Sequence, residues 1–135
     1  MNPKKRCLFL LAIWGSIFLV YVCSTNVRAS LWASACLTAM PDTWVARLTP
    51  TGSMEPTLTD KDWLIFQRVP FGQVRKGDVI SFYCPMDGVP VVHRVVERLD
   101  DGRLITKGDN NPLPDPWVVS ITDYRGLLIA AYSDE

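Results

Sequence analysis

The sequence predicts a mainly β protein, in which a small antiparallel β domain, a sheet or barrel-like, is attached to one N-terminal transmembrane helix. Three observations predict this fold class. An uncharged apolar run, Cys7–Cys23, lies near the start of the chain. Short runs of strand-forming residues, separated by turn signals, occupy the chain from Trp63 onward. Residues 41–135 suffice for one small hydrophobic core.

The N-terminal apolar run predicts a membrane anchor at residues 7–23. Its length lies near the lower limit of what crosses the apolar interior of a bilayer. Lys4, Lys5 and Arg6 precede it, and cations stay on the cytoplasmic side of a membrane. We therefore expect a single-pass protein of the cell membrane, with residues 1–6 in the cytoplasm and the β domain on the non-cytoplasmic side.

A cleavable signal peptide is the alternative interpretation of the same run. Small residues that would suit cleavage occur at 33–35 and at 27–29. The run is longer than the apolar core of an ordinary signal peptide, which favours a retained anchor. Residues 24–49 are then a connector, and residues 50–135 form the folded domain.

The β domain is predicted from strand and turn signals. Six strands are predicted, at residues 63–69, 79–83, 91–97, 103–106, 118–122 and 127–131. Asp101 and Gly102, between two alternating runs, predict a β-hairpin. Pro112, Pro114 and Pro116 exclude regular structure from the loop that contains them.

Charge and cysteine content limit the possible functions. Residues 1–40 hold four cations and no acid, so residues 41–135 carry the other ten cations and all fourteen acids. This distribution argues against nucleic-acid binding, which needs clustered Lys and Arg. The four cysteines form no CxxC pair, and a single histidine cannot complete a Cys/His zinc site. Cys36 and Cys84 either form a disulfide, in an oxidising compartment, or remain separate thiols.

Two residues are candidates for nucleophilic chemistry. Ser53 lies in the segment TGSMEPTL, between a glycine and a proline-containing turn that constrains the loop. His93 is the only histidine and interrupts the apolar run VVHRVV. On a strand its imidazole shares a face with Val91 and Val95 and needs a partner for each ring nitrogen. A buried structural histidine meets this need, and so does a general base, since imidazole changes protonation near neutral pH.

A loop rich in carboxylates follows the predicted strand at 103–106. Asp109 and Asp115 are the candidates for a carboxylate that orients the imidazole, the third member of a catalytic triad. Asp109 also suits a turn position, and Asp115 also suits a solvated loop. The sequence leaves the choice between the two carboxylates open.

Taken together, these segments resemble the conserved boxes of the type I signal peptidases, which are S26 serine peptidases. TGSMEPTL is similar to the nucleophile box of that family. DWLIF at 62–66 and KGDVISF at 76–82 are similar to the two strand boxes that follow. VHRV at 92–95 and TKGDNN at 106–111 are similar to the last two. The resemblance covers residues 50–130, with the boxes in the order of the family.

A histidine at the position of the base indicates the endoplasmic-reticulum and archaeal form of the family, whereas the common bacterial form has lysine there. The resemblance implies that Ser53 is the nucleophile, His93 the general base and Asp115 the supporting acid. Asp109 would organise the same loop. The Thr51 hydroxyl and the backbone N–H of Ser53 would form the oxyanion hole.

The resemblance also implies an activity. It is that of a membrane-bound serine endopeptidase that cleaves signal peptides from exported precursor proteins through an acyl-enzyme, with an Ala-x-Ala-like preference. The expected partners are signal peptides, membrane lipid and the export machinery, and no nucleic acid. No metal or cofactor is implied.

Other functions remain open. A peptidase dedicated to one substrate, such as a pilin, or one that transfers the acyl group to an amine, would use the same fold and residues. A catalytically inactive, membrane-tethered β module that binds peptides would leave Ser53 unreactive. A self-cleaving Ser–Lys switch protein would need an N-terminal DNA-binding domain, whereas residues 1–40 are apolar.

A lysine base is disfavoured by its surroundings in the sequence. A catalytic lysine must be neutral, which requires an apolar setting that depresses its pKa. Lys61 and Lys107 adjoin acidic residues, and Lys76 lies in a turn. An ordinary imidazole needs no such shift, because it titrates at about 6.5.

Overall fold

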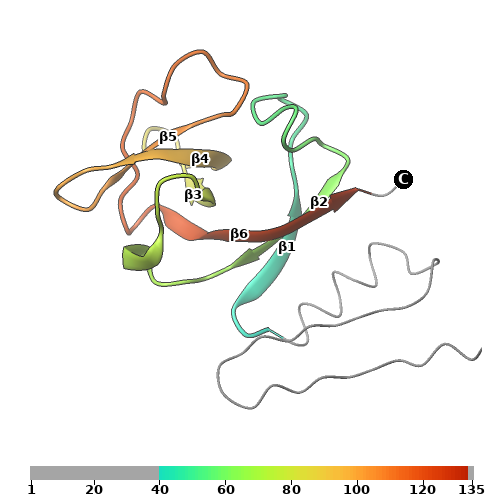
Figure 1. Cartoon of the computed structure of the whole chain (residues 1–135), viewed down its shortest axis with the longest axis horizontal. Helices are drawn as coiled ribbons and strands as arrows, with labels where there is room; N and C mark the ends of the chain where they lie inside the picture. The colour runs from blue at the N-terminus through green and yellow to red at the C-terminus, as the bar shows by residue number, and fades with distance from the viewer. Residues whose placement is uncertain (1–39, 134–135) are drawn as a thin grey trace, which may run out of the picture.

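The computed structural model describes residues 40–133, which form one antiparallel sheet and a short 3-10 helix (Figure 1). The elements in chain order are β1 (Thr43–Arg47), β2 (Asp62–Gln67), the 3-10 helix η1 (Phe71–Gln73), β3 (Val79–Tyr83), β4 (Pro90–Arg98), β5 (Leu104–Lys107) and β6 (Tyr124–Ser133). The mainly β, antiparallel fold that the sequence predicts is confirmed.

The sheet has the strand order β1-β2-β6-β3-β4-β5, with every neighbouring pair antiparallel. β1 and β5 are its edges, and the C-terminal strand β6 lies between β2 and β3. The register with β6 shifts between Ile65 and Phe66 and again between Ser81 and Phe82. Such bulges increase the local twist of a strand, and the sheet is strongly coiled in Figure 1.

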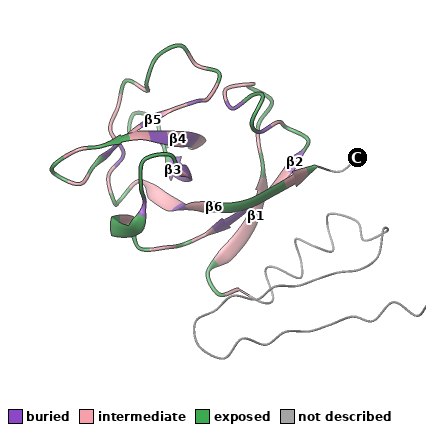
Figure 2. Cartoon of the chain, in the orientation of Figure 1, coloured by how far each residue is buried: buried purple, intermediate pink, exposed green. Residues whose placement is uncertain are grey.

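Two hydrophobic clusters form the core, and β3 contributes to both because its side chains alternate between the two faces. Ile80 and Phe82 belong to the first cluster. Val79 belongs to the second, together with Met54 and Leu58 from the loop after β1. The buried residues concentrate on β2 and β3 (Figure 2). The second cluster therefore anchors a loop that lies outside the strands.

The hairpin predicted at Asp101 and Gly102 is confirmed between β4 and β5. Leu99 N–H donates to Arg103 O at 2.9 Å, and Gly102 N–H donates to Leu99 O at 2.9 Å. Gly102 has a φ of 84°, which a residue with a side chain rarely adopts. The connection is thus a three-residue loop that closes on a left-handed glycine.

The strand predicted at 118–122 is wrong. In this segment only Val119 forms a bridge, to Leu104. Ser120 instead starts a turn, since both its N–H and its hydroxyl donate to the carboxylate of Asp123, the N–H at 2.9 Å. Such side-chain bonds compete with strand pairing, and β6 begins directly after the turn, at Tyr124.

β1 lies within residues 24–49, which the sequence suggested as a connector. It pairs with β2 from Thr43 to Arg47. The Trp44 ring stacks on Phe66 with centroids 5.6 Å apart and passes so close to Gly126 that a Cβ there would lie 2.2 Å from the ring. A tryptophan covering a glycine on a nearby strand thus docks β1 onto the sheet.

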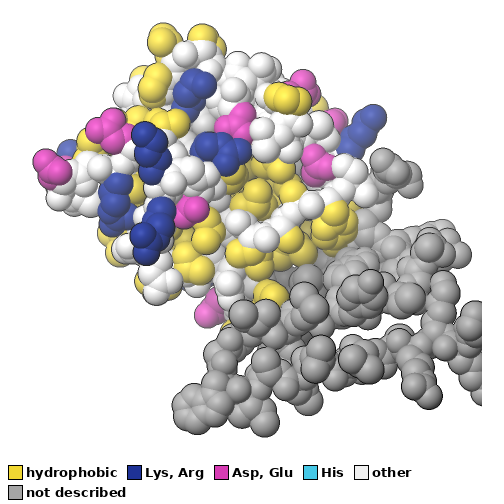
Figure 3. Space-filling model, viewed as in Figure 1, with side chains coloured by type: hydrophobic (Ala, Val, Ile, Leu, Met, Phe, Trp, Pro, Cys, Tyr) yellow, Lys and Arg dark blue, Asp and Glu magenta, His cyan; other side chains and the backbone are white. Residues whose placement is uncertain are grey.

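The predicted anchor, the signal-peptide alternative and Cys36 lie outside the described residues. Within 40–133, no helix is both long and apolar enough to span a bilayer. Cys84 is buried. On the face shown in Figure 3, blue Lys and Arg side chains gather at one side with magenta carboxylates among them, so both signs of charge are present there.

Candidate active site

Ser53 lies in the loop between β1 and β2, directly after a glycine with a left-handed backbone. Gly52 has a φ of 71°, a region that residues with a side chain rarely adopt. A turn follows, in which Glu55 N–H donates to Gly52 O at 3.2 Å. Met54 and Leu58 are only 1% and 4% exposed. The core therefore holds the turn in place, with Ser53 at its start.

His93 lies on β4, opposite Ile80 of β3. The residue is buried, with 7% exposure, and its ring meets that of Phe82 edge-on at a centroid distance of 6.5 Å. The Nε2 atom lies 3.2 Å from Ser53 Oγ. The Nδ1 atom lies 2.8 Å from Asp115 Oδ2. Both ring nitrogens therefore have a polar partner.

Asp115 lies in the loop after β5, and its side chain is 5% exposed. Its backbone N–H donates to Thr106 O at 2.8 Å. The Thr106 hydroxyl donates to Asp115 Oδ2 at 2.6 Å, the same oxygen that faces the imidazole. Thr106 is fully buried. It was not identified from the sequence, because its contact with Asp115 depends on the path of the proline-containing loop.

The carboxylate determines where the imidazole carries its proton. An ionised carboxylate only accepts hydrogen bonds, so Nδ1 of His93 must donate to Asp115. Nε2 then presents its lone pair to Ser53 and can accept the hydroxyl proton. The hydroxyl, the imidazole and the carboxylate form one continuous chain of hydrogen bonds.

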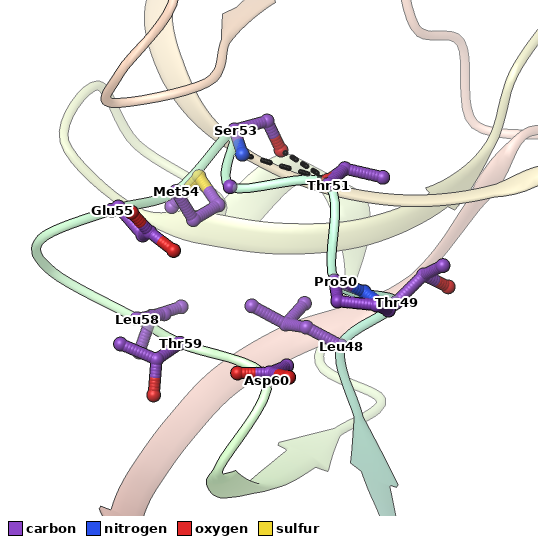
Figure 4. A pocket seen from close by; sticks show the side chains of 11 residues that line it. Leu48, Thr49, Pro50, Thr51, Ser53, Met54, Glu55, Leu58, Thr59 and Asp60 are labelled. Carbon is purple, nitrogen blue, oxygen red and sulfur yellow. Dashed lines mark hydrogen bonds between the residues drawn. The ribbon is translucent and has the colours of Figure 1, made fainter.

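Thr51 lies beside the serine hydroxyl. Its Oγ1 donates to Ser53 Oγ at 3.3 Å, and Ser53 N–H points to the same Oγ1 at 3.5 Å (Figure 4). A cavity of about 180 Å³ opens next to both residues. The residues that line it are Leu48, Thr49, Pro50, Thr51, Gly52, Ser53, Met54, Glu55, Leu58, Thr59 and Asp60.

Asp109 has different partners from Asp115. Its two carboxylate oxygens accept from Arg94, at 2.8 Å from Nε and 2.6 Å from Nη2. These hydrogen bonds from Arg94 hold the pKa of Asp109 below its usual range, with smaller contributions from Thr57 and Lys107. Arg94 also donates to the carbonyl of Gly77 at 2.8 Å. Asp109 thus fastens its loop to β4, while Asp115 contacts the imidazole.

The three lysines considered as alternative bases have polar surroundings. Lys61 and Lys76 are exposed. Lys107 is half-buried on β5, where its charge acts on the Asp109 carboxyl. None of these settings is the apolar one that a neutral lysine requires.

A serine hydroxyl, an imidazole and a carboxylate joined in this order form the arrangement that serine hydrolases use. In the described residues this arrangement lies at one end of an antiparallel β-sheet. A family model described as "Signal peptidase, peptidase S26" matches residues 9–98, which include both Ser53 and His93. The chain belongs to this family, and the resemblance noted in its sequence is confirmed.

The chain is also similar to catalytic subunits of signal peptidase complexes. It is 44% identical over 70 residues to the "Signal peptidase complex catalytic subunit SEC11" of Eremothecium gossypii, covering 48% of this chain and 41% of that protein. The Metarhizium robertsii protein of the same name is 36% identical over 69 residues, covering 48% and 40%. Human "Signal peptidase complex catalytic subunit SEC11C" is 35% identical over 69 residues, covering 48% and 36%. The chain therefore matches less than half the length of each of these relatives.

Proposed function

We propose that the protein is a membrane-anchored serine endopeptidase that removes signal peptides from exported precursor proteins. The observation that carries the proposal is the chain of hydrogen bonds from Ser53 through His93 to Asp115, in a member of the signal peptidase family. Ser53 is the nucleophile, His93 the general base, and Asp115 the carboxylate that orients the imidazole and stabilises its protonated form.

The first half of the reaction acylates the serine. Ser53 Oγ attacks the scissile carbonyl carbon while its proton passes to His93 Nε2, because a neutral hydroxyl is a poor nucleophile. The carbonyl oxygen becomes negative in the tetrahedral intermediate. The N–H of Ser53 and the Thr51 hydroxyl lie on one side of the serine and donate hydrogen bonds to this negative oxygen. When the C–N bond breaks, Nε2 returns the proton to the leaving amine.

The second half releases the acyl group. A water molecule takes the position of the departed amine and gives a proton to His93 Nε2 as its oxygen attacks the ester carbon. Collapse of the second tetrahedral intermediate breaks the bond to Ser53 Oγ, which recovers its proton from Nε2. The enzyme returns to its starting state, and the precursor has been hydrolysed at one peptide bond.

The cavity beside Ser53 supports a substrate with a short side chain at the cleavage site. At about 180 Å³ it is smaller than the pockets of roughly 300–1,000 Å³ that usually hold small-molecule ligands. The buried side chains of Met54 and Leu58 contribute to its lining. A small residue such as alanine next to the scissile bond is compatible with this site, as the signal-peptide proposal requires.

The full chain, embedded in lipid, tests the proposal when incubated with a panel of secretory precursors. Mapping of the new N-termini should show cleavage after short side chains in several precursors, and Ser53→Ala should produce none. Cleavage of a single precursor, such as a pilin, would indicate a dedicated processing peptidase. If no precursor is cut by the wild-type protein, the proposed function is wrong.

A further inference from the structure

Asn110 binds two consecutive carbonyl groups of the loop that carries Ser53. Its backbone N–H donates to Ser53 O at 2.9 Å. Its side-chain Nδ2 donates to Gly52 O at 3.1 Å. The two loops meet closely, since a Cβ at Gly108 would lie 2.6 Å from Ser53 O. Figure 1 shows the loops after β1 and after β5 facing each other at one end of the sheet.

Two hydrogen bonds to Gly52 O fix the direction of Ser53 N–H: Glu55 N–H donates at 3.2 Å from within the turn, and Asn110 Nδ2 donates at 3.1 Å from the facing loop. In a trans peptide the C=O and the N–H of one unit point in opposite directions in a plane. Because Glu55 N–H and Asn110 Nδ2 together hold the Gly52 carbonyl on one side, Ser53 N–H must point to the other. On that side lies the Thr51 hydroxyl, 3.5 Å from Ser53 N, and the cavity that both residues line.

Within its own loop, this peptide unit is held at Gly52 O by the bond from Glu55 N–H. Gly52 has no side chain, so its backbone can adopt many conformations at little cost. A rotation of the Gly52–Ser53 peptide would turn the N–H away from the cavity without displacing the serine hydroxyl far. The Nδ2 of Asn110 is the only donor from outside the loop that binds Gly52 O among the hydrogen bonds of residues 40–133.

We propose that Asn110 is a positioning residue that directs the N–H of Ser53 at the oxyanion of the tetrahedral intermediate. The proposal rests on the serine chemistry proposed above, though not on signal peptides as the substrate. Among the described residues, Asn110 is not part of the cavity lining and has no hydrogen bond to the imidazole, so it acts through the Gly52–Ser53 peptide. Its side chain should therefore affect the transition state more than substrate binding.

Two variants of the full-length protein in lipid test this role. Asn110→Asp keeps the shape of the side chain and replaces its donor by an acceptor, and Asn110→Ala removes the donor without adding charge. Agreement between the two separates the lost donor from the added charge. Leu113→Ala is the matched control, because it shortens a 72% exposed side chain in the same loop.

The probe is a peptidyl fluorophosphonate with a methyl group in place of the side chain at the cleavage site. Ser53 Oγ forms a bond to phosphorus as its proton passes to His93 Nε2, fluoride leaves, and the phosphonyl oxygen occupies the oxyanion position. We expect both Asn110 variants to label about tenfold more slowly or worse, since loss of a whole oxyanion donor costs about 10²–10³-fold. With a cleavable peptide, kcat should fall while KM and the shape of the pH profile stay close to the wild type.

Equal labelling rates in the wild type and both Asn110 variants would overturn the proposal. The proposal would also be overturned if the Asn110 variants labelled slowly only because they unfold at the assay temperature, or if Leu113→Ala labelled as slowly as they do. If the wild type labels but cleaves no precursor, the signal-peptide function fails, while slower labelling of both Asn110 variants still supports the role of Asn110. A wild type that does not label at all overturns both.

Discussion

The hydroxyl of Thr106 and the imidazole of His93 bind the same carboxylate oxygen. Thr106 Oγ1 lies 2.6 Å from Asp115 Oδ2, and His93 Nδ1 lies 2.8 Å from that atom. Both are donors, so one oxygen of Asp115 accepts two hydrogen bonds in a buried setting. The fully buried Thr106 therefore fixes the carboxylate that orients the imidazole.

Thr106→Val should lower both stability and activity. Valine has nearly the same shape but no hydroxyl, and a lost hydrogen bond to a charged group costs about 1.5–3 kcal/mol. Urea unfolding should show a loss in this range, and peptide cleavage should show a lower kcat. Thr106→Ser restores the donor and should recover most of the activity. If Ser and Val behave alike, the hydroxyl has no part in holding Asp115.

Asp115→Asn should lower the cleavage activity less than Asp115→Ala does. The amide oxygen can occupy the position of Oδ2, where it accepts from both Thr106 and Nδ1, so the imidazole keeps its proton on Nδ1. What is lost is the negative charge that stabilises the imidazolium. We expect kcat/KM to fall about tenfold to a hundredfold, which corresponds to about 1.4–2.7 kcal/mol. Equal losses in the two variants would show that the double acceptor is not what sets the proton position.

Asp109→Asn should reduce stability in a pH-dependent way. Arg94 holds the pKa of Asp109 below its usual range, so the ion pair stabilises the fold above the pKa of the unfolded carboxyl, about 3.9. This contribution is lost as the pH falls through the lower pKa of the folded protein. Thermal unfolding should therefore separate wild type and variant most at neutral pH and least in strong acid. Asp101→Asn, on an exposed pair in the β4–β5 turn, is the matched control.

The membrane topology can be tested without substrate. The cations at 4–6 before the uncharged run predict that residues 41–135 lie on the non-cytoplasmic side. Protease added outside spheroplasts should reach the domain, and carbonate should leave the protein in the membrane. Protection from external protease, or release by carbonate, would contradict the predicted anchor and its orientation.

Sequence patterns predicted most of the sheet because alternation and turn residues are local. The hairpin at Gly102 and the strand that carries His93 follow directly from such patterns. The residues at 118–122 have the composition of a strand, so a strand is predicted there. The side-chain bonds from Ser120 to Asp123 that end the pairing do not show in strand propensity. β1 is short, and it is held in place by Trp44, which packs over Gly126 of β6, a strand that is distant in sequence.

The residues of the candidate site also differ in how far the sequence predicts them. The segments around Ser53 and His93 carry recognisable patterns of their own. The choice between Asp109 and Asp115 depends on how the loop after β5 folds back. Backbone hydrogen bonds such as the one from Asp115 N–H to Thr106 O determine that path. Thr106 and Asn110 act through contacts with residues distant in sequence, across a strand and between two loops. No local pattern indicates such contacts.

Measurement of kcat/KM for a cleavable precursor in the two single variants and the double variant tests whether Ser53 and His93 act as one catalytic unit. Ser53→Ala should abolish cleavage while changing the free energy of unfolding by no more than about 1 kcal/mol. His93→Ala should be as damaging, and the double variant scarcely worse, because members of one catalytic unit are not additive. An active His93→Ala enzyme, or losses in the two single variants that add in the double variant, would show that the two residues do not act as one unit.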